Sequence, residues 1–334
     1  MHMQRVYFSS TCTVSSASPP TTQRPRIILA RCVGGSCASL LLVGMAPRVL
    51  CVIPARFAST RLHGKPLLHV DGAPMIAHVI RAARAAANVH EVLVATDHDA
   101  IARVARAEGV DAIMTDSALP SGTDRVAAAL LQRCGAPADV VVNVQCDEPR
   151  VEPAAIELVS ELLLRRQAAD MSTLSAPLER AALLDPNRVK VVCCAEPPEQ
   201  GAAGAAGVGG GGAAERALYF SRAPIGVDRE LMRALLQPEE AHALHASPRA
   251  EADASAYACR LHVGLYGFRA AALHRLVALP PSPLEVLERL EQLRAIEAGM
   301  HIVVGRVASA PHGVDTEADL RAVQGPGFRA IDGA

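Results

Sequence analysis

The chain has 334 residues, of which 50% are hydrophobic and 20% are charged, enough apolar material for one large domain or two small ones. Its 33 basic and 34 acidic side chains give a formal net charge of −1. Broad electrostatic attraction to nucleic acid or to a membrane surface is therefore excluded, and an anionic ligand must be bound locally. The nine cysteines form no C-x-x-C pair, which disfavours structural zinc and indicates reduced thiols in a reducing compartment.

Residues 1–48 differ from the rest because they contain five arginines and no acidic residue, the first acid of the chain being Asp71. Three interpretations stay open. The composition suits an organellar transit peptide, and the apolar run 32–46 suits a short anchor or a signal h-region, although it is short for a membrane span. Alternatively, translation begins at Met45 and the upstream residues are a gene-prediction artefact. We leave this extension out of the fold prediction.

From Val49 onward, short β-branched runs alternate with alanine-rich helical segments, which predicts helices covering a largely parallel sheet. The elements expected in the first half are strands at 49–54, 91–96, 111–115 and 140–144, and helices at 75–87, 98–108 and 123–133. Ligands of open α/β sheets bind beyond the carboxyl ends of the strands. The residues after Ile53, Thr96 and Val144 are therefore the expected site.

The second half is less regular. We expect strands at 189–194, 217–221, 260–268 and 301–307, and an amphipathic helix at 284–298. A Gly/Ala-rich stretch at 201–214 and a polar, alanine-rich stretch at 237–255 are predicted to be surface insertions. The prediction is thus one α/β domain over 49–325 with a mixed, mostly parallel sheet, followed by a tail at 326–334.

A basic loop follows the first strand, where residues 54–67 read P-A-R-F-A-S-T-R-L-H-G-K-P-L. Arg56, Arg61 and Lys65 stand among small residues, and their charges together with free backbone N–H groups suit a polyphosphate. A solvated basic loop is the simple alternative. The loop is not a Walker motif, because the GK[ST] ending is missing, and no G-x-G-x-x-G follows the strand.

Further motifs follow in chain order: S-G-T-D-R at 121–125, N-V-Q-C-D-E-P at 143–149, Y-F-S-R-A at 219–223, H-V-G-L-Y-G at 262–267, L-E-Q-L-R at 290–294 and G-V-D-T at 313–316. With the basic loop, this series resembles the sugar-nucleotide cytidylyltransferases, and most closely the CMP-Kdo synthetases. The resemblance covers 49–323 except the two insertions. It implies a Rossmann-like nucleotidyltransferase fold with a smaller sugar-binding and dimer-forming subregion.

The resemblance also implies a reaction in which a sugar hydroxyl attacks the α-phosphate of CTP and pyrophosphate leaves, which requires aligned reactants and stabilised negative charge. Arg56 and Lys65 suit the phosphates. Asp147 and Asp315 each follow a predicted strand and are expected to hold Mg²⁺, although a lone aspartate there is more often a cap or turn residue. We expect these four residues to be catalytic. The implied CTP-binding residues are Ala55, Arg56, Ser59, Lys65, Ser121, Thr123, Arg125 and Gln145.

For the sugar, the resemblance implies recognition by Arg222, His262, Tyr266, Glu291 and Gln292. An arginine can hold the sugar carboxylate in a bidentate pair, and the other four can hydrogen-bond its hydroxyls. Taken singly, the histidine could be a partly buried strand residue, the tyrosine a packing residue and the Glu-Gln pair an exposed helix face. The family pattern favours the site.

Three departures from the family pattern stand out. Cys146 replaces the usual glycine beside Asp147, His63 stands where proline is common, and Gly226-Val227 replaces a frequent Pro-Trp. The last two are expected to tune loops only. Cys146 matters more, because a backbone that approaches the triphosphate or takes a positive φ favours glycine; it could slow the enzyme, make it sensitive to oxidants, or be tolerated.

The expected activity is CTP plus 3-deoxy-manno-octulosonate (Kdo) giving CMP-Kdo plus pyrophosphate, which activates the sugar for lipopolysaccharide or cell-wall polysaccharide synthesis. The alternatives are an enzyme for sialate or an amino-substituted Kdo, or a relative that binds nucleotide without turnover. The expected partners are CTP and Kdo, no nucleic acid and a second copy of the chain. The domain is expected in the cytoplasm, or in a mitochondrion or plastid if residues 1–48 are a transit peptide, with membrane contact only through a retained anchor.

Overall fold

The computed structural model describes residues 4–8, 12–16, 28–32, 47–58, 62–196, 215–236 and 258–324. The chain divides into two compact units, Met1–Pro47 and Arg48–Ala334. The predicted insertions 201–214 and 237–255 and the tail 326–334 lie outside the described residues. Among the residues that are described, no helix is long and apolar enough to cross a bilayer.

The first unit contains three short strands, which pair antiparallel in the order β1-β2-β3: β1 (Gln4–Phe8), β2 (Cys12–Ser16) and β3 (Ile28–Cys32).

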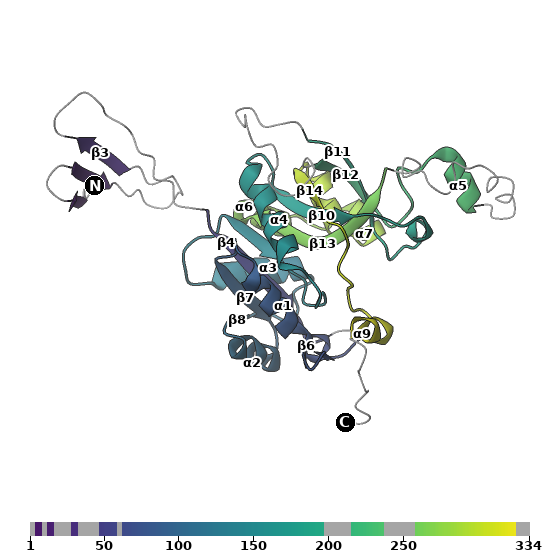
Figure 1. The fold of residues 1–334 in the computed structure, drawn as a ribbon, viewed down its shortest axis with the longest axis horizontal. Helices are drawn as coiled ribbons and strands as arrows, with labels where there is room; N and C mark the ends of the chain where they lie inside the picture. Colours follow the sequence, from purple (N-terminus) through teal and green to yellow (C-terminus); the bar gives the residue numbers. More distant parts are fainter. Residues whose placement is uncertain are drawn as a thin grey trace. The chain divides into compact units, whose positions relative to one another are not determined.

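The described part of the second unit is built on a nine-stranded sheet (Figure 1). Its order is β10 (Met171–Ala176), β14 (Ile302–Arg306), β12 (Glu215–Ser221), β11 (Lys190–Ala195), β13 (Arg260–Arg269), β9 (Val140–Asn143), β4 (Val49–Ala55), β7 (Glu91–Thr96) and β8 (Asp111–Met114). The strands from β9 to β8 are all parallel. β12 and β13 run against the other seven, because each of their pairings is antiparallel.

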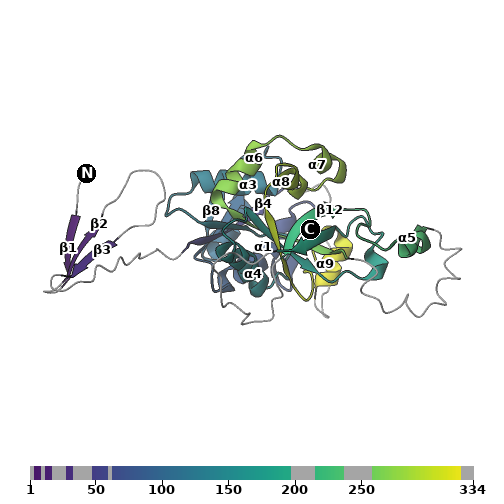
Figure 2. The same cartoon turned by 90° about the horizontal axis from the view of Figure 1, so that it is seen from above.

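Helices cover both faces of this sheet. The helices of the described residues are α1 (Met75–Ala85), α2 (Asp99–Ala107), α3 (Gly122–Gln132), α4 (Pro153–Arg165), α5 (Arg229–Leu236), α6 (Ala270–Ala278), α7 (Pro283–Glu288), α8 (Gln292–Glu297) and α9 (Glu317–Val323). Of these, α5 and α9 pack in smaller clusters outside the two that cover the sheet. Successive side chains of β4 point to opposite faces of the sheet. Val49, Cys51 and Ile53 therefore pack in the core under α1, α2 and α4. Leu50 and Val52 pack in the core on the other face, under α3, α6 and α8. Figure 2 shows α3, α6 and α8 on one side of the sheet and α4 on the other.

The second half forms the smaller subregion of the domain. Five strands pair in a closed circuit, in the order β10-β14-β12-β11-β13. The circuit closes because β13 also pairs with β10. This circuit adjoins β9, which ends the series of four parallel strands, through β13. The mixed, mostly parallel α/β fold predicted from the sequence is confirmed.

The predicted helix 284–298 is wrong as one continuous element. Arg289 takes a left-handed conformation with φ 52°, which ends α7 before α8 begins at Gln292. The Arg294 guanidinium donates to both carboxylate oxygens of Glu285 and ties the two short helices together. Hydrophobic periodicity continues across such a break, because residues on both sides of it face the same core.

β10 was not predicted, because its sequence M-S-T-L-S-A is half polar. All six residues are nevertheless buried. The hydroxyls are satisfied inside the protein: Ser172 Oγ donates to the Val159 carbonyl oxygen over 2.6 Å and Ser175 Oγ to that of Gly305 over 3.2 Å. A strand whose polar side chains bond to neighbouring backbone lacks the apolar run that identifies a buried strand.

Candidate active site

A cavity of about 220 Å³ lies beyond the carboxyl ends of β4 and β9, beside the start of α3. Parallel strands and the helix that follows them converge here, as expected for an open α/β sheet. The residues that line it are Pro54, Arg56, Lys65, Pro66, Leu119, Pro120, Ser121, Gly122, Arg125, Gln145, Cys146, Asp147 and Asp315. We call it the nucleotide cavity.

Lys65 joins two carboxylates in this cavity. Its Nζ lies 2.7 Å from Asp147 Oδ2 and 2.9 Å from Asp315 Oδ1. Lys65 is only 8% exposed, and it opens a short 3₁₀ helix (η1, Lys65–Leu67) after Gly64, whose φ of 63° favours glycine. Burial lowers the pKa of the lysine, but its bonds to the two carboxylates outweigh burial, so the pKa is raised and the lysine is charged.

The two aspartates come together because the chain's last described segment returns to the basic loop. Val314 is fully buried and its N–H donates to the Asp147 carbonyl oxygen over 2.9 Å. Thr316 caps α9 in a capping box with Asp319, whose Oδ2 also accepts the Asp315 N–H. In Figure 1, α9 lies near β6 (Ala73–Pro74), and its Leu320 and Val323 pack in one cluster with Leu62 and Met75.

Four other residues predicted for the nucleotide line this cavity: Arg56, Ser121, Arg125 and Gln145. Arg125 is buried and donates to Thr115 Oγ1 and to Asp97 Oδ2, and Gln145 Nε2 donates to Asn143 Oδ1. Ser121 is the N-cap of α3. Arg56 lines the cavity, whereas Ala55 and Thr123 are buried behind it. Ser59 lies outside the described residues.

Cys146 lines the nucleotide cavity without backbone strain. Among the described non-glycine residues only Asp71 and Arg289 have positive φ, so Cys146 does not occupy a conformation that requires glycine. Burial, and secondarily the charge of Asp147, raises the pKa of the thiol to about 12. The neutral thiol is the unreactive form, so the structure favours a tolerated replacement over an oxidant-sensitive one.

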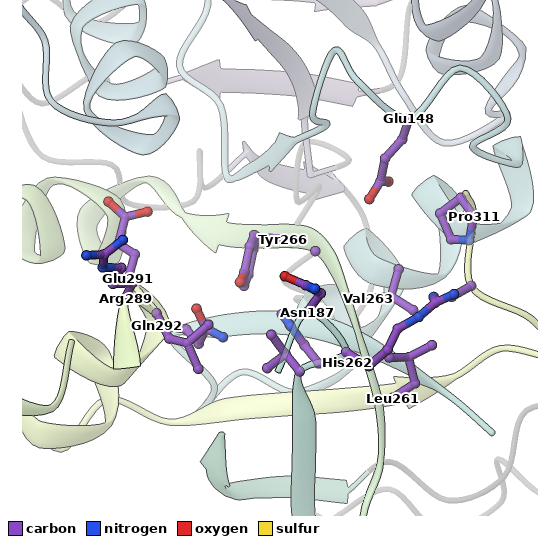
Figure 3. A pocket seen from close by; sticks show the side chains of 15 residues that line it. Glu148, Asn187, Leu261, His262, Val263, Tyr266, Arg289, Glu291, Gln292 and Pro311 are labelled. Carbon is purple, nitrogen blue, oxygen red and sulfur yellow. The ribbon is translucent and has the colours of Figure 1, made fainter. Parts of the chain in front are cut away.

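A second cavity, of about 290 Å³, lies over β13 and α8 (Figure 3). Four of the five predicted sugar residues line it: His262, Tyr266, Glu291 and Gln292. The residues that complete it are Glu148, Asn187, Arg188, Val189, Leu261, Val263, Gly264, Arg289, Leu290, Ala310 and Pro311. We call it the sugar cavity.

His262 is neutral in this cavity, because burial lowers its pKa to about 3. Its Nε2 lies 3.0 Å from Thr173 Oγ1, which is itself 3.0 Å from the carbonyl oxygens of Val263 and Leu265. Burial and the negative charges of Glu291 and Glu148 raise the pKa of Tyr266, so its phenol also stays neutral. Both rings therefore present neutral hydrogen-bonding groups.

Glu291 connects the two cavities. Its carboxylate accepts hydrogen bonds from Ser121 Oγ, over 2.7 Å, and from Thr123 Oγ1. Burial raises the pKa of Glu291 more than these two bonds lower it. A residue predicted for the sugar thus holds two residues predicted for the nucleotide.

Arg222 does not line the sugar cavity, and the structure does not bring it together with the other four predicted sugar residues. Its guanidinium donates to the carbonyl oxygens of Glu288, Pro186 and Arg289, over 2.7, 2.8 and 3.3 Å. These bonds tie the loop before Asn187 to the break between α7 and α8. Arg222 thus lies behind the cavity wall, and its predicted contact with the sugar carboxylate stays a prediction.

Sequence reasoning missed several cavity residues. Arg188 and Arg289 bring cationic side chains to the sugar cavity, and Arg188 follows the loop that Arg222 anchors. Glu148 was visible only as part of the D-E-P motif. Burial, and secondarily the charge of Asp147, raises its carboxyl pKa to about 8. No local signal separates these side chains from ordinary surface residues.

Comparison with known proteins shows which family this chain is similar to. The cytidylyltransferase family model matches residues 50–302. The 3-deoxy-manno-octulosonate cytidylyltransferase of Rhodopseudomonas palustris (strain HaA2) is 43% identical over 282 residues, covering 82% of this chain and 96% of the relative. That of Acidobacterium capsulatum is 40% identical over 277 residues, covering 83% and 95%.

A solved structure of CMP:2-keto-3-deoxy-manno-octonic acid synthetase complexed with CTP aligns with a TM-score of 0.65 and 35% identity, covering 83% of this chain and 96% of that one. The fold is that of a nucleotidyltransferase. The chain belongs to the cytidylyltransferase family. The family indicated by the motifs is thereby confirmed.

Enzymes of this class generally use a divalent metal ion. Among the described residues no group of three or more histidine, cysteine, aspartate or glutamate side chains could hold one. Asp147 and Asp315 nevertheless place carboxylate oxygens within 2.9 Å of the same Lys65 Nζ, so they converge on one point in the nucleotide cavity. Two carboxylates completed by substrate phosphates form a donor set that fits such an ion.

Proposed function

We propose that this protein transfers CMP from CTP to Kdo, giving CMP-Kdo and pyrophosphate. The observation that carries the proposal is the adjoining pair of cavities. One gathers Lys65, Asp147 and Asp315. The other presents the neutral rings of His262 and Tyr266 together with acidic and basic side chains, among them Glu291, which also bonds Ser121 in the first cavity. The names of the relatives support CTP as donor and Kdo as acceptor.

In this reaction a sugar hydroxyl attacks the α-phosphate, an O–P bond forms, and the bond to pyrophosphate breaks. Lys65 and Arg56 would neutralise charge on the triphosphate. Arg125, Gln145 and the α3 cap at Ser121 would hold the nucleoside. Holding both substrates in adjoining cavities converts their encounter into an oriented step, which lowers the entropic part of the barrier.

Mg²⁺ is the ion that we assign to Asp147 and Asp315, because it prefers oxygen ligands and commonly binds through one or two carboxylates plus substrate phosphates. When bound, it would neutralise charge on the triphosphate and polarise it. The chain's own contribution is Lys65, which already holds the two carboxylates in place.

For the sugar, we assign His262, Tyr266, Glu291 and Gln292 to its hydroxyls. Because Arg222 is engaged with three carbonyl oxygens, we assign the sugar carboxylate to the arginines that line the cavity, Arg188 and Arg289. A cavity with two such cations near its walls favours an anionic sugar over a neutral one.

The direct test is pyrophosphate release from CTP with Mg²⁺ and a panel of acid sugars: Kdo, its 8-amino form and sialate, with mass spectrometry of the product. Turnover with Kdo at least tenfold above the others supports the proposal. Faster turnover with sialate or the amino sugar would assign a different acceptor, and CTP binding without any pyrophosphate release would make the chain a non-catalytic relative. Sedimentation of the same sample tests the predicted homodimer.

A further inference from the structure

One turn after β9 sends consecutive side chains into the two cavities. Asp147 lines the nucleotide cavity and Glu148 lines the sugar cavity. The turn is fixed by backbone bonds from Glu148 N–H to the Gln145 carbonyl oxygen, from Val151 N–H to that of Glu148, and from Val314 N–H to that of Asp147. The positions of the two carboxyl groups are therefore coupled through rigid backbone.

Glu148 stands over the floor of the sugar cavity. On β13, His262, Gly264 and Tyr266 all line the cavity, and a Cβ added at Gly264 would lie 3.9 Å from Glu148 Oε1. Figure 3 shows the Glu148 carboxylate directed toward the centre of the cavity, with Tyr266 and His262 below it in this view. The glycine leaves open the space between the strand and the carboxyl group.

The second carboxyl oxygen of Glu148 is shielded from solvent and has no hydrogen-bond partner among the described residues. Buried polar atoms are almost always hydrogen-bonded, and leaving one unpaired is costly. Lys65 donates hydrogen bonds to Asp147 and Asp315, and among the described residues no donor reaches the second oxygen of Glu148. A partner must come from the side of the sugar cavity.

We propose that Glu148 determines acceptor specificity by accepting a hydrogen bond from one hydroxyl of the acid sugar. This inference rests on the proposed function and deepens it. The sugar is then oriented with a hydroxyl toward Glu148 and its carboxylate toward the two arginines that line the cavity, Arg188 and Arg289. Since Asp147 is the next residue in the chain, the contact also fixes the sugar relative to the triphosphate.

The first test compares Glu148→Ala and Glu148→Gln with Glu152→Ala, a matched control at an exposed glutamate four residues further on. We expect the KM for Kdo to rise about 10- to 100-fold in Glu148→Ala, because a buried hydroxyl of the bound sugar is left without its partner. Glu148→Gln keeps one acceptor oxygen and should lose less. The KM for CTP, the Mg²⁺ requirement and the unfolding temperature should stay at parental values, and Glu152→Ala should change nothing.

The second test uses Kdo analogues that each lack one hydroxyl. In the parent, the analogue without the partner hydroxyl should react more slowly than Kdo. In Glu148→Ala, that analogue and Kdo should react at nearly the same rate, because the contact is already gone. The inference is overturned if the rate with each analogue, relative to the rate with Kdo, is the same in the parent and in Glu148→Ala. It is also overturned if the Glu148 variants change the KM for CTP or the Mg²⁺ requirement as much as the KM for Kdo. Absence of CMP-Kdo formation by the parent would instead overturn the proposed function.

Discussion

The nucleotide cavity and the sugar cavity are built in different ways. Most of the nucleotide cavity comes from short stretches that follow β4 and β9 and precede α3, and its charges face one another directly. The sugar cavity is assembled from a loop, a bulged strand and the break between two helices, all in the less regular half. A cavity made of contiguous motifs can be predicted from them. The motif residues of the sugar cavity were predicted too, but Arg188 and Arg289, which come from loops, were not.

The largest effect should follow loss of the lysine at the centre of the nucleotide cavity. We expect Lys65→Met to lower kcat about 100- to 1,000-fold, the usual result of removing one preorganised charge contact, and to leave the KM for Kdo unchanged. Asp147 and Asp315 are partly exposed, so the free energy of unfolding should fall by less than about 1 kcal/mol. Steady-state kinetics and urea unfolding measure both.

The control for this experiment is Arg103→Met, which removes an exposed cation from α2. If Lys65→Met kept turnover within a few-fold of the parent, the basic loop would be a solvated surface loop.

Variants of Arg222 test whether this residue positions the wall of the sugar cavity or binds the sugar directly. Arg222→Ala leaves three carbonyl oxygens without their donor, so we expect the free energy of unfolding to fall by about 1–3 kcal/mol and the KM for Kdo, but not for CTP, to rise. Arg222→Lys should restore little of the stability or of the parental KM for Kdo, because an ammonium cannot reach three carbonyls in the geometry of a guanidinium. A raised KM for Kdo at parental stability, recovered by lysine, would return Arg222 to the sugar carboxylate.

The pH dependence of stability tests the burial of His262. Its pKa is about 3 in the folded protein and about 6.5 when unfolded. Between these values the unfolded chain binds the extra proton, so stability is lost as pH falls below about 6.5. In His262→Gln, the free energy of unfolding should fall less steeply with falling pH, by up to about 1.4 kcal/mol per pH unit. Urea unfolding from pH 7 to pH 4 measures this slope. An unchanged slope would mean that the ring is charged or exposed.

The smallest effect is expected from the Gly/Ala insertion 201–214. β11 ends at Ala195 and β12 begins at Glu215, and these two residues pair in the ladder. A tight turn can therefore join the strands, and loop length has only a slow entropic effect. Replacing the insertion by Asn-Gly should change kcat and both KM values by less than about twofold; a folded but inactive variant would give the insertion a role in the site.

Much of the first half could be predicted from the sequence, because its buried strands are apolar runs and its helices are amphipathic. β7 has the predicted bounds, and the other elements that were predicted in this half differ by one or two residues at an end, whereas α4 was not predicted. The break at Arg289 and the half-polar strand β10 were missed, since the first depends on a backbone conformation and the second on hydroxyl bonds to distant carbonyls. Lys65 was predicted for the phosphates and Asp147 with Asp315 for one Mg²⁺. The contacts of Lys65 with both carboxylates were not predicted, because they depend on the return of the segment before α9.

The most direct measurement is a double-mutant cycle on the two carboxylates that meet at Lys65. Asp147→Asn, Asp315→Asn and the double variant keep the shape of each side chain and remove the charge, and kcat is measured against Mg²⁺ concentration. Each single variant should lose about 100- to 1,000-fold in turnover and need more Mg²⁺, and the second substitution should cost far less than the first, as for residues that act as a unit. Without ligand, all three should unfold within about 1 kcal/mol of the parent, because Lys65 offsets the repulsion between the carboxylates. Additive losses, or near-parental turnover at unchanged Mg²⁺ demand in either single variant, would contradict a shared site for one ion on the triphosphate.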